Sequence, residues 1–260
     1  MADRGRPTRA GWAVVLLLVV ALVAAPVSTG RGLADAPRVL VLTRTEGFRH
    51  ASIPQARRAL VTIGAQAGLR VTLTSDVRRF TPEGLRPFRA VVFALTTGDV
   101  LDPPAQTALR RFVERGGGFA GIHSAADTES GWPFYGRLLG ARFRAHPPVQ
   151  AAVVEVIDRS HPSTAHLPRR WERTDEWYAF AEGPDRAVHV LARLDERSYS
   201  PGEASMGGGH PIAWCQRVGR GRSWYTAGGH TVAAYAEPDF REHLAGGLRY
   251  ATGQAAAGCS

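Results

Sequence analysis

The chain has 260 residues, of which 44% are hydrophobic and 21% are charged, as in ordinary soluble globular proteins. Its formal net charge is +9, and because the sequence contains no lysine, arginine supplies every strongly basic side chain. The arginines are scattered singly or in pairs such as Arg57 and Arg58. Nucleic-acid binding requires basic residues clustered on one face, so we expect no nucleic-acid partner.

Residues 1–36 have the pattern of a secretory signal. Three arginines in the first nine residues precede an uncharged apolar run over residues 12–27, and small residues follow. The run is shorter than the ~20 residues of a membrane-spanning helix, which favours a signal peptide over a permanent anchor. We therefore expect a secreted, extracytoplasmic protein. The alternative is an uncleaved N-terminal anchor, which would be its only membrane contact.

Short apolar runs then alternate with amphipathic stretches, which predicts one α/β domain over residues 37–252. Such alternation is typical of a mainly parallel sheet with helices on both faces. Near the C-terminus, two strands joined by a tight glycine turn predict a hairpin that extends the sheet. The predicted strands are residues 38–42, 70–74, 90–95, 149–157, 187–194, 211–217 and 222–227, with one more between the glycines at 116–118 and His123. A closing helix is predicted over residues 239–250.

Residues 121–125 carry the most informative motif. In Gly-Ile-His-Ser-Ala, small residues flank a central polar one at the end of a buried strand, the outline of a nucleophile elbow. Such an elbow presents its middle side chain at the carboxyl edge of a sheet. That position usually holds Ser or Cys, but here it holds His123.

The two cysteines do not fit a catalytic or zinc motif. Export would permit a disulfide between them, but Cys215 lies in a predicted strand, where we expect a buried, inert thiol. Cys259 lies in a tail of small residues, and we expect residues 253–260 to be disordered. No Cys-x-x-Cys pair is present, which argues against a thiolate zinc site.

Several motifs in order along residues 38–252 resemble the ThuA-like (trehalose-utilisation) family, a branch of the class I glutamine amidotransferase-like superfamily. The motifs are residues 43–50 with Ser52 and Ile53, residues 116–127, residues 143–147, His161 with Pro162, residues 175–178, residues 210–214 with 219–222, and residues 228–230. The resemblance implies a flavodoxin-like three-layer sandwich and a role in carbohydrate metabolism. Amidotransferases of the superfamily use an elbow Cys and a late His. Here those positions match His123 and His230, so a glutamine amidotransferase is not expected.

Four of the nine histidines fall at strand ends or loops within these motifs: His50, His123, His146 and His230. Together with Asp127 and Glu176 they are the candidate site, and Asp127 is placed to orient the His123 ring across the elbow. Imidazoles with carboxylates suit either general acid–base catalysis near neutral pH or a divalent metal. The sequence requires no cofactor; if a metal is bound, His123 and His230 are the expected ligands.

Residues 175–178, Asp-Glu-Trp-Tyr, fit a sugar site, because carboxylates bind hydroxyl groups and aromatic faces stack on sugar rings. If the strand alternates, only one of the two acids faces the cleft, and we favour Glu176. We assign Trp177 and Tyr178 to substrate binding with His50 and His146; the alternative is that the aromatic residues belong to the core. A second acid across a glycosidic bond could come from Asp127, Glu129 or Glu46.

The sequence therefore predicts an exported protein that processes a disaccharide, glycoside or keto-sugar, with a hydrolase as the enzyme class. The predicted catalytic residues are His123, His230, Glu176 and Asp127. Two alternatives remain open at this stage. One is a non-catalytic carbohydrate-binding protein, and the other is a metal-dependent hydrolase of a non-sugar substrate.

Overall fold

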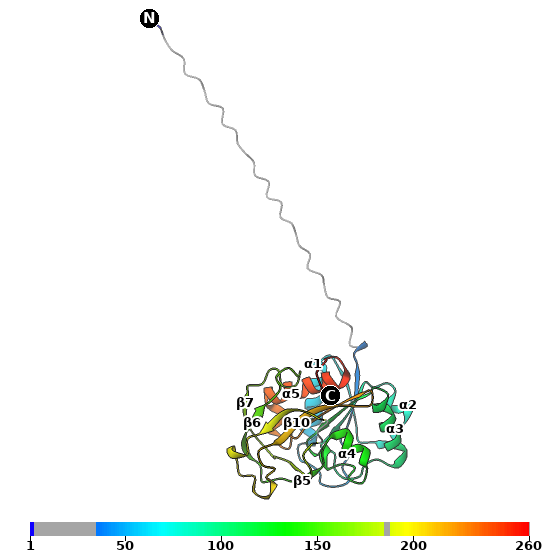
Figure 1. The fold of residues 1–260 in the computed structure, drawn as a ribbon. Helices are drawn as coiled ribbons and strands as arrows, with labels where there is room; N and C mark the ends of the chain where they lie inside the picture. Colours follow the sequence, from blue (N-terminus) through cyan, green and yellow to red (C-terminus); the bar gives the residue numbers. More distant parts are fainter. Residues whose placement is uncertain (3–34, 185–187, 260) are drawn as a thin grey trace. The chain divides into compact units, whose positions relative to one another are not determined.

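The computed structural model describes residues 1–2, 35–184 and 188–259 (Figure 1). The signal peptide or anchor predicted for residues 1–36 lies almost entirely outside these residues. Within the described ranges, no helix combines the length and hydrophobicity that crossing a membrane requires.

Among the described residues, one mixed sheet of nine strands forms the centre of the fold, in the order β2-β1-β3-β4-β11-β10-β9-β6-β7. The five strands from β2 to β11 pair in parallel, and the strands from β11 to β7 pair antiparallel. Their bounds are Arg38–Leu42 (β1), Arg70–Thr74 (β2), Ala90–Ala94 (β3), Gly118–Ile122 (β4), Gln150–Val156 (β6), Arg170–Asp175 (β7), His189–Leu194 (β9), His210–Val218 (β10) and Gly221–Thr226 (β11). The predicted α/β fold, a mainly parallel sheet with an antiparallel extension, is confirmed.

Five α-helices, several 3-10 turns and a small second sheet complete the described part of the chain. The helices are Ile53–Gln66 (α1), Pro82–Leu85 (α2), Pro103–Glu114 (α3), Pro133–Leu139 (α4) and Pro238–Thr252 (α5). The second sheet pairs β5 (Phe143–Ala145) with β8 (Ala179–Phe180). The sequence interpretation did not identify β5, β7, β8, α2 or α4.

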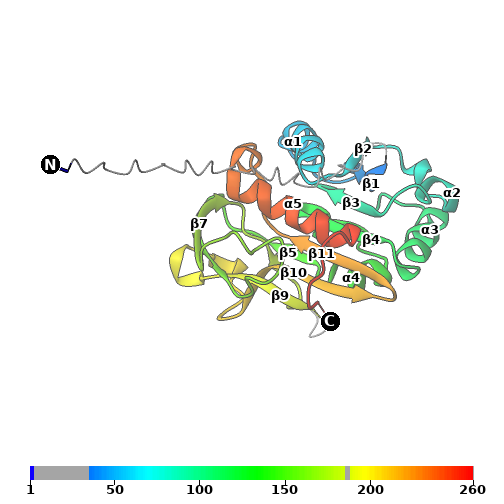
Figure 2. The same ribbon diagram turned by 90° about the horizontal axis from the view of Figure 1, so that it is seen from above.

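Helices pack on both faces of the sheet at β4. A Cβ on Gly118 would meet the backbone of Ala251 in α5, whereas a Cβ on Gly121 would meet Leu139 in α4. Because successive strand residues face opposite sides, the two helices cover different faces. Figure 2 shows α5 beside α1 on one side of the sheet and α4 on the other. All five residues of β4, the strand that carries His123 at its end, are buried.

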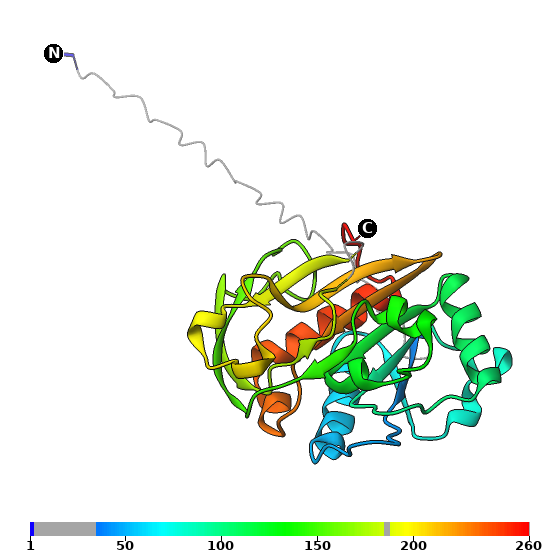
Figure 3. The ribbon, with the colours of Figure 1, turned by 60° about the horizontal axis from the view of Figure 1, so that its bottom comes forward.

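A disulfide joins Cys215 in β10 to Cys259 near the C-terminus, so the predicted free thiol at Cys215 is wrong. After α5 the chain turns at Gly253, whose φ of +76° favours glycine, and runs back beside the β10–β11 hairpin (Figure 3). This return brings the two Cα atoms to 5.7 Å, a normal disulfide spacing. Cys259 is therefore buried at 8% exposure.

Loss of this disulfide is expected to lower the free energy of unfolding by about 2–4 kcal/mol, because the bond closes a loop across 44 residues and restricts the unfolded chain. Urea unfolding of the oxidised protein and of the Cys259→Ala variant measures the difference. The reduced wild type is the matched control and should unfold with the variant. Equal midpoints for the oxidised and reduced forms would contradict the prediction.

A second prediction concerns His243, which lies on the buried face of α5. Its Nδ1–H donates to the carbonyl oxygen of Ser163 at 2.8 Å, and its Nε2 accepts from the Thr226 hydroxyl at 3.1 Å. Burial lowers the pKa of His243 to about 3, from an ordinary value near 6.5. Between those pH values the unfolded chain binds a proton at this residue that the folded chain does not.

The free energy of unfolding should therefore fall as the pH is lowered from about 6.5 toward 3, by up to ~1.4 kcal/mol per pH unit from this residue. The contribution is fully present above pH ~6.5. Urea unfolding at several pH values should give a shallower dependence for His243→Gln, which does not titrate. An identical pH dependence of the two proteins would show that His243 is not the source.

Candidate functional site

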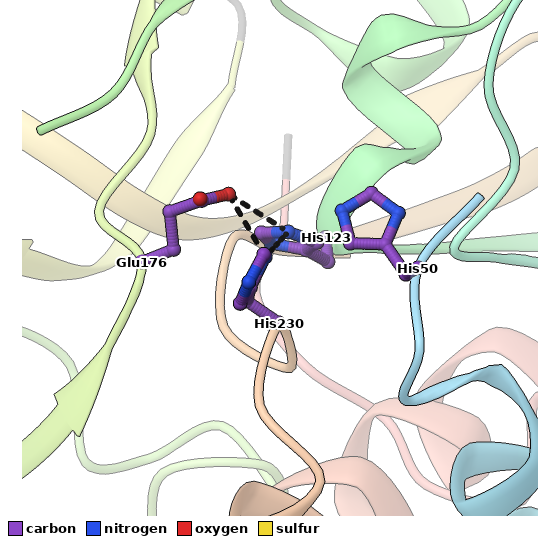
Figure 4. Close-up of side chains that lie close together, drawn as sticks. All are labelled: His50, His123, Glu176 and His230. Atoms are coloured by element: carbon purple, nitrogen blue, oxygen red, sulfur yellow. Dashed lines mark hydrogen bonds and ion pairs between the residues drawn. The ribbon is translucent and has the colours of Figure 1, made fainter. Parts of the chain in front are cut away.

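Three histidines from distant parts of the chain meet at one edge of the sheet. His50 follows β1, His123 follows β4 and His230 follows β11, and these three strands are parallel. Glu176 joins them from the end of β7 (Figure 4). One potential ligand atom from each of the four residues lies within 4.8 Å of the other three. The cluster thus occupies the carboxyl edge of the parallel strands, the position at which α/β sheets bind ligands.

The predicted elbow forms at His123. β4 ends at Ile122, and His123 has a φ of +53°, a left-handed conformation that is uncommon for a non-glycine residue. A short 3-10 turn, His123–Asp127 (η3), follows. A Cβ at Gly121 would lie 3.2 Å from the Ala125 Cβ, so the small residues around His123 allow this sharp turn. The sequence interpretation of residues 121–125 matches this backbone.

Glu176 is the centre of the polar contacts in the cluster. Its Oε2 lies 3.0 Å from His230 Nδ1 and 3.4 Å from His123 Nε2. Its Oε1 lies 3.1 Å from His146 Nδ1, so the two carboxylate oxygens have different partners. The neighbouring Asp175 is not among the cavity-lining residues and bonds instead to the backbone amides of Gly229 and His230.

A backbone carbonyl holds the His123 ring. His123 Nδ1 lies 2.7 Å from the oxygen of Ala227, and because a carbonyl only accepts, Nδ1 carries the proton. The Tyr178 ring packs on the imidazole with centroids 4.2 Å apart. The sequence analysis placed Asp127 as the residue that orients this ring. The structure gives that position to Ala227, and Asp127 lies at the exposed end of η3.

Asp175 positions His230 through the backbone. Its carboxylate accepts from the amides of Gly229 at 2.7 Å and His230 at 3.0 Å, and it pairs with Arg173 at 2.8 Å. Gly229 has a φ of +113°, and a Cβ there would lie 2.8 Å from the Tyr235 hydroxyl. Asp175 and its partner Arg173 thus hold the backbone of the candidate residue His230, and the sequence analysis did not select them. The adjacent acids of residues 175–178 were the available signal, but only Glu176 was selected from them.

Protonation differs among the clustered residues. Burial and the neighbouring His123 and His230 lower the pKa of His50 to about 3, so this imidazole is neutral. Burial alone would raise the pKa of Glu176, but hydrogen bonds and charge from His123 and His230 outweigh it and lower the value to about 2. A hydrogen bond to Glu176 raises the pKa of His230. The ionised Glu176 is therefore suited to binding a cation or a hydroxyl group and poorly suited to donating a proton.

A cavity of about 210 Å³ opens onto the cluster. Six of the predicted site residues line it together with two phenylalanines: His50, Asp127, His146, Glu176, Tyr178 and His230, with Phe48 and Phe143. His123 lies beneath its floor with no exposed surface. Partial desolvation raises the pKa of the Asp127 carboxyl above its ordinary value.

Three other predicted residues do not reach the cavity. Trp177 is fully buried and donates from Nε1 to the Gln150 carbonyl, so it belongs to the core, the alternative noted for this residue. Glu129 accepts from the amides of Val100 and Leu101 and is also buried. Glu46 pairs with Arg44. Of the three acids considered as partners for Glu176, only Asp127 lines the site.

A larger hollow of about 480 Å³ lies elsewhere, between α2 and α3. Its lining includes Arg89 and Gly117, which immediately precede β3 and β4. It therefore lies at the amino-terminal edge of the parallel strands, away from the clustered histidines. This hollow has more than twice the volume of the cavity at the histidines, but its lining has no imidazole and only one carboxylate, Glu83. The smaller cavity is the better candidate because it combines position with reactive side chains.

The fold and the histidine elbow define an α/β protein with the class I glutamine amidotransferase-like fold. The sequence pattern of the family described as "ThuA: Trehalose utilisation" matches residues 38–251, and the chain belongs to this family. The resemblance inferred from the sequence motifs is thereby confirmed. No curated protein matches the chain in a sequence comparison.

Solved structures share the fold. A ThuA-like protein from Bacteroides uniformis has 24% identity and a TM-score of 0.70, over 84% of this chain and 93% of that one. A ThuA-like protein from Parabacteroides merdae has 20% identity and the same TM-score, over 84% and 90% of the two chains. PurLQS from Thermotoga maritima has 12% identity and a TM-score of 0.54, over 83% and 99%. At these identities the likeness establishes the fold alone.

Proposed function

We propose that this protein is an exported enzyme of carbohydrate metabolism that acts on a disaccharide, glycoside or keto-sugar without a cysteine nucleophile. The observation that carries the proposal is the convergence of three histidines and Glu176 at the elbow edge of the sheet. The family's association with trehalose utilisation supports a sugar as the substrate class. The N-terminal pattern of residues 1–36 supports export.

The lining of the cavity suits a sugar. Glu176 and Asp127 offer oxygens to hydroxyl groups, and Phe48, Phe143 and Tyr178 offer apolar rings. The volume of about 210 Å³ lies below the ~300–1,000 Å³ of pockets for drug-sized ligands, so it suits one small unit such as a single sugar ring. We therefore place one ring of the substrate in the cavity and any second ring outside it.

The exposed residues at the mouth are assigned to proton transfer. The His146 side chain is 41% exposed and lies against Glu176, and Asp127 has a raised pKa. A histidine and a carboxyl group at the mouth are in a position to exchange protons with a bound hydroxyl or carbonyl group. The buried His123 forms the floor of the reactive centre and contacts Glu176 and His230.

A substrate screen tests the proposal. The full-length protein is incubated with trehalose, other disaccharides, aryl glycosides and keto-sugars, and turnover is followed by proton NMR spectroscopy. We expect at least one of these compounds to be converted. Saturable sugar binding without any conversion would support the non-catalytic binding alternative, and absence of both would overturn the assignment to carbohydrates.

A further inference from the structure

Three potential ligand atoms form a nearly equilateral triangle at the floor of the cavity. The edges are 3.0 Å between His230 Nδ1 and Glu176 Oε2, 3.3 Å between His230 Nδ1 and His123 Nε2, and 3.4 Å between His123 Nε2 and Glu176 Oε2. Ligands bound at about 2.1 Å from a transition metal are separated by ~3.0 Å in octahedral and ~3.4 Å in tetrahedral sites. The triangle therefore has the dimensions of one face of a metal coordination shell.

The hydrogen bonding of His123 leaves a lone pair inside this triangle. Its Nδ1 proton is committed to the Ala227 carbonyl, so the neutral ring has an unprotonated Nε2. That nitrogen faces a carboxylate oxygen, which is also an acceptor. Two such acceptors require a cation between them or a proton, which could lie on His123 Nε2 or on His230 Nδ1, 3.0 Å from Oε2 and 3.3 Å from Nε2. A metal ion satisfies both without a charge on the buried imidazole.

We infer that His50, His123, His230 and Glu176 together bind one divalent transition-metal ion. The inference deepens the proposed function. It rests on that proposal only for the claim that the ion belongs to the sugar-processing centre. His50 supplies the fourth ligand, with its ring edge-on to His123 and His230 at centroid separations of 4.9 and 5.1 Å (Figure 4). Three imidazoles and one carboxylate favour Zn²⁺, Fe²⁺, Co²⁺ or Ni²⁺ over the oxygen-preferring Mg²⁺ and Ca²⁺.

The surroundings of the cluster match those of metal ligands in proteins. Histidine ligands usually donate their second ring N–H to a carbonyl or carboxylate, as His123 does to Ala227. Glu176 uses Oε2 within the triangle while His146 holds Oε1. Asp175 fixes the backbone of His230. Each of these three ligands is thus oriented by a partner outside the cluster.

The position beside the cavity leaves room for a substrate on the ion. His50, Glu176 and His230 all line the cavity, so a bound ion would contact its interior. Catalytic metal sites keep such an open coordination position, whereas structural sites are closed by protein ligands. The ion would polarise a hydroxyl or carbonyl oxygen of the sugar, which is the Lewis-acid role of metals in catalysis.

Another group of potential ligands in the described residues does not share these features. His161 lies near Cys215 and Cys259, but the two sulfur atoms are joined in the disulfide. The oxidised pair provides no thiolate, and a metal requires the thiolate form. The cluster at the elbow is therefore the one to which a metal ion is assigned.

Metal binding is tested without any sugar. Untagged full-length protein is purified without chelator, and its metal content is measured by inductively coupled plasma mass spectrometry. The protein is then stripped and titrated with Zn²⁺ by calorimetry. We expect one ion per chain, and at least ~100-fold weaker binding for His123→Asn and Glu176→Gln, since loss of a second-shell partner alone costs ~10–100-fold.

The choice of variants keeps the test informative. Asn tolerates the left-handed backbone at position 123, and Gln has nearly the size of Glu, so both proteins should fold. Circular dichroism checks this, and the exposed His166→Ala variant is the matched control, with unchanged affinity expected. Folded wild type that binds none of Zn²⁺, Fe²⁺, Co²⁺ and Ni²⁺, or binding that both variants retain, would overturn the inference.

The metal inference and the proposed carbohydrate function can be refuted independently. Sugar conversion by protein that binds no metal would overturn the metal inference and leave the carbohydrate function intact. One bound ion in a protein that neither binds nor converts sugars would do the reverse. The two measurements therefore assign a failure to one proposal or the other.

Discussion

Replacement of Asp175 by alanine is expected to lower the free energy of unfolding by about 3–5 kcal/mol. Asp175 is fully buried and pairs with Arg173, whose side chain is 3% exposed. Removing Asp175 leaves the buried guanidinium of Arg173 with only one carboxylate partner, the partly exposed Glu237 at 3.0 Å, and the loss of a partner from a buried ion pair accounts for an effect of this size. The amides of Gly229 and His230 also lose their acceptor. Urea unfolding monitored by tryptophan fluorescence measures the change.

Two further variants separate the causes. Asp175→Asn keeps an oxygen acceptor but loses the charge, so its effect should be intermediate. Glu114→Ala removes an exposed i,i+4 ion pair with Arg110 and should change the free energy of unfolding by less than ~0.5 kcal/mol. If Asp175→Ala were as mild as Glu114→Ala, the role of Asp175 as the anchor of the loop at residues 228–230 would be refuted.

The second large effect is expected at His123. Once a substrate is identified, His123→Asn should reduce kcat/KM by ~10²–10⁴-fold, because the side chain contacts both Glu176 and His230 at the floor of the site. Asn is preferred to Ala as the replacement because position 123 has a φ of +53°. Steady-state kinetics with the purified proteins provide the measurement.

His166→Ala is the kinetic control, since His166 is exposed and its ring bonds to the carbonyl of Asp239 rather than to the site. Its kcat/KM should equal that of the wild type. The thermal unfolding midpoint of His123→Asn is recorded alongside, so that a loss of activity is not a loss of folded protein. Wild-type kinetics in a folded His123→Asn variant would show that the elbow is not the reactive centre.

Most of the candidate site could be predicted from the sequence, because its residues follow the ends of predicted strands. His50, His123 and His230 each follow a parallel strand, and parallel strands end at a common edge. The buried strands β1, β3 and β4 were also predictable, because their continuous apolar runs have no competing interpretation. The local sequence thus determined both these elements and the edge at which their polar neighbours gather.

β7 was not predictable by the same means. Its inward positions include Arg173 and Asp175, which are buried as an ion pair, so the apolar alternation that marks a strand is lost. The disulfide was missed because the return of the chain after α5 brings Cys259 to β10 only in three dimensions. The Ala227 carbonyl that orients His123 has no side-chain signature in the sequence.

The most direct test of the reactive centre is a crystal structure of protein purified without chelator, with anomalous diffraction recorded above and below the zinc, iron, cobalt and nickel edges. The account predicts one anomalous peak within about 2.0–2.3 Å of ligand atoms from His50, His123, His230 and Glu176. Four side chains separated beyond a shared coordination shell, or a peak bound elsewhere with none at the elbow, would contradict it.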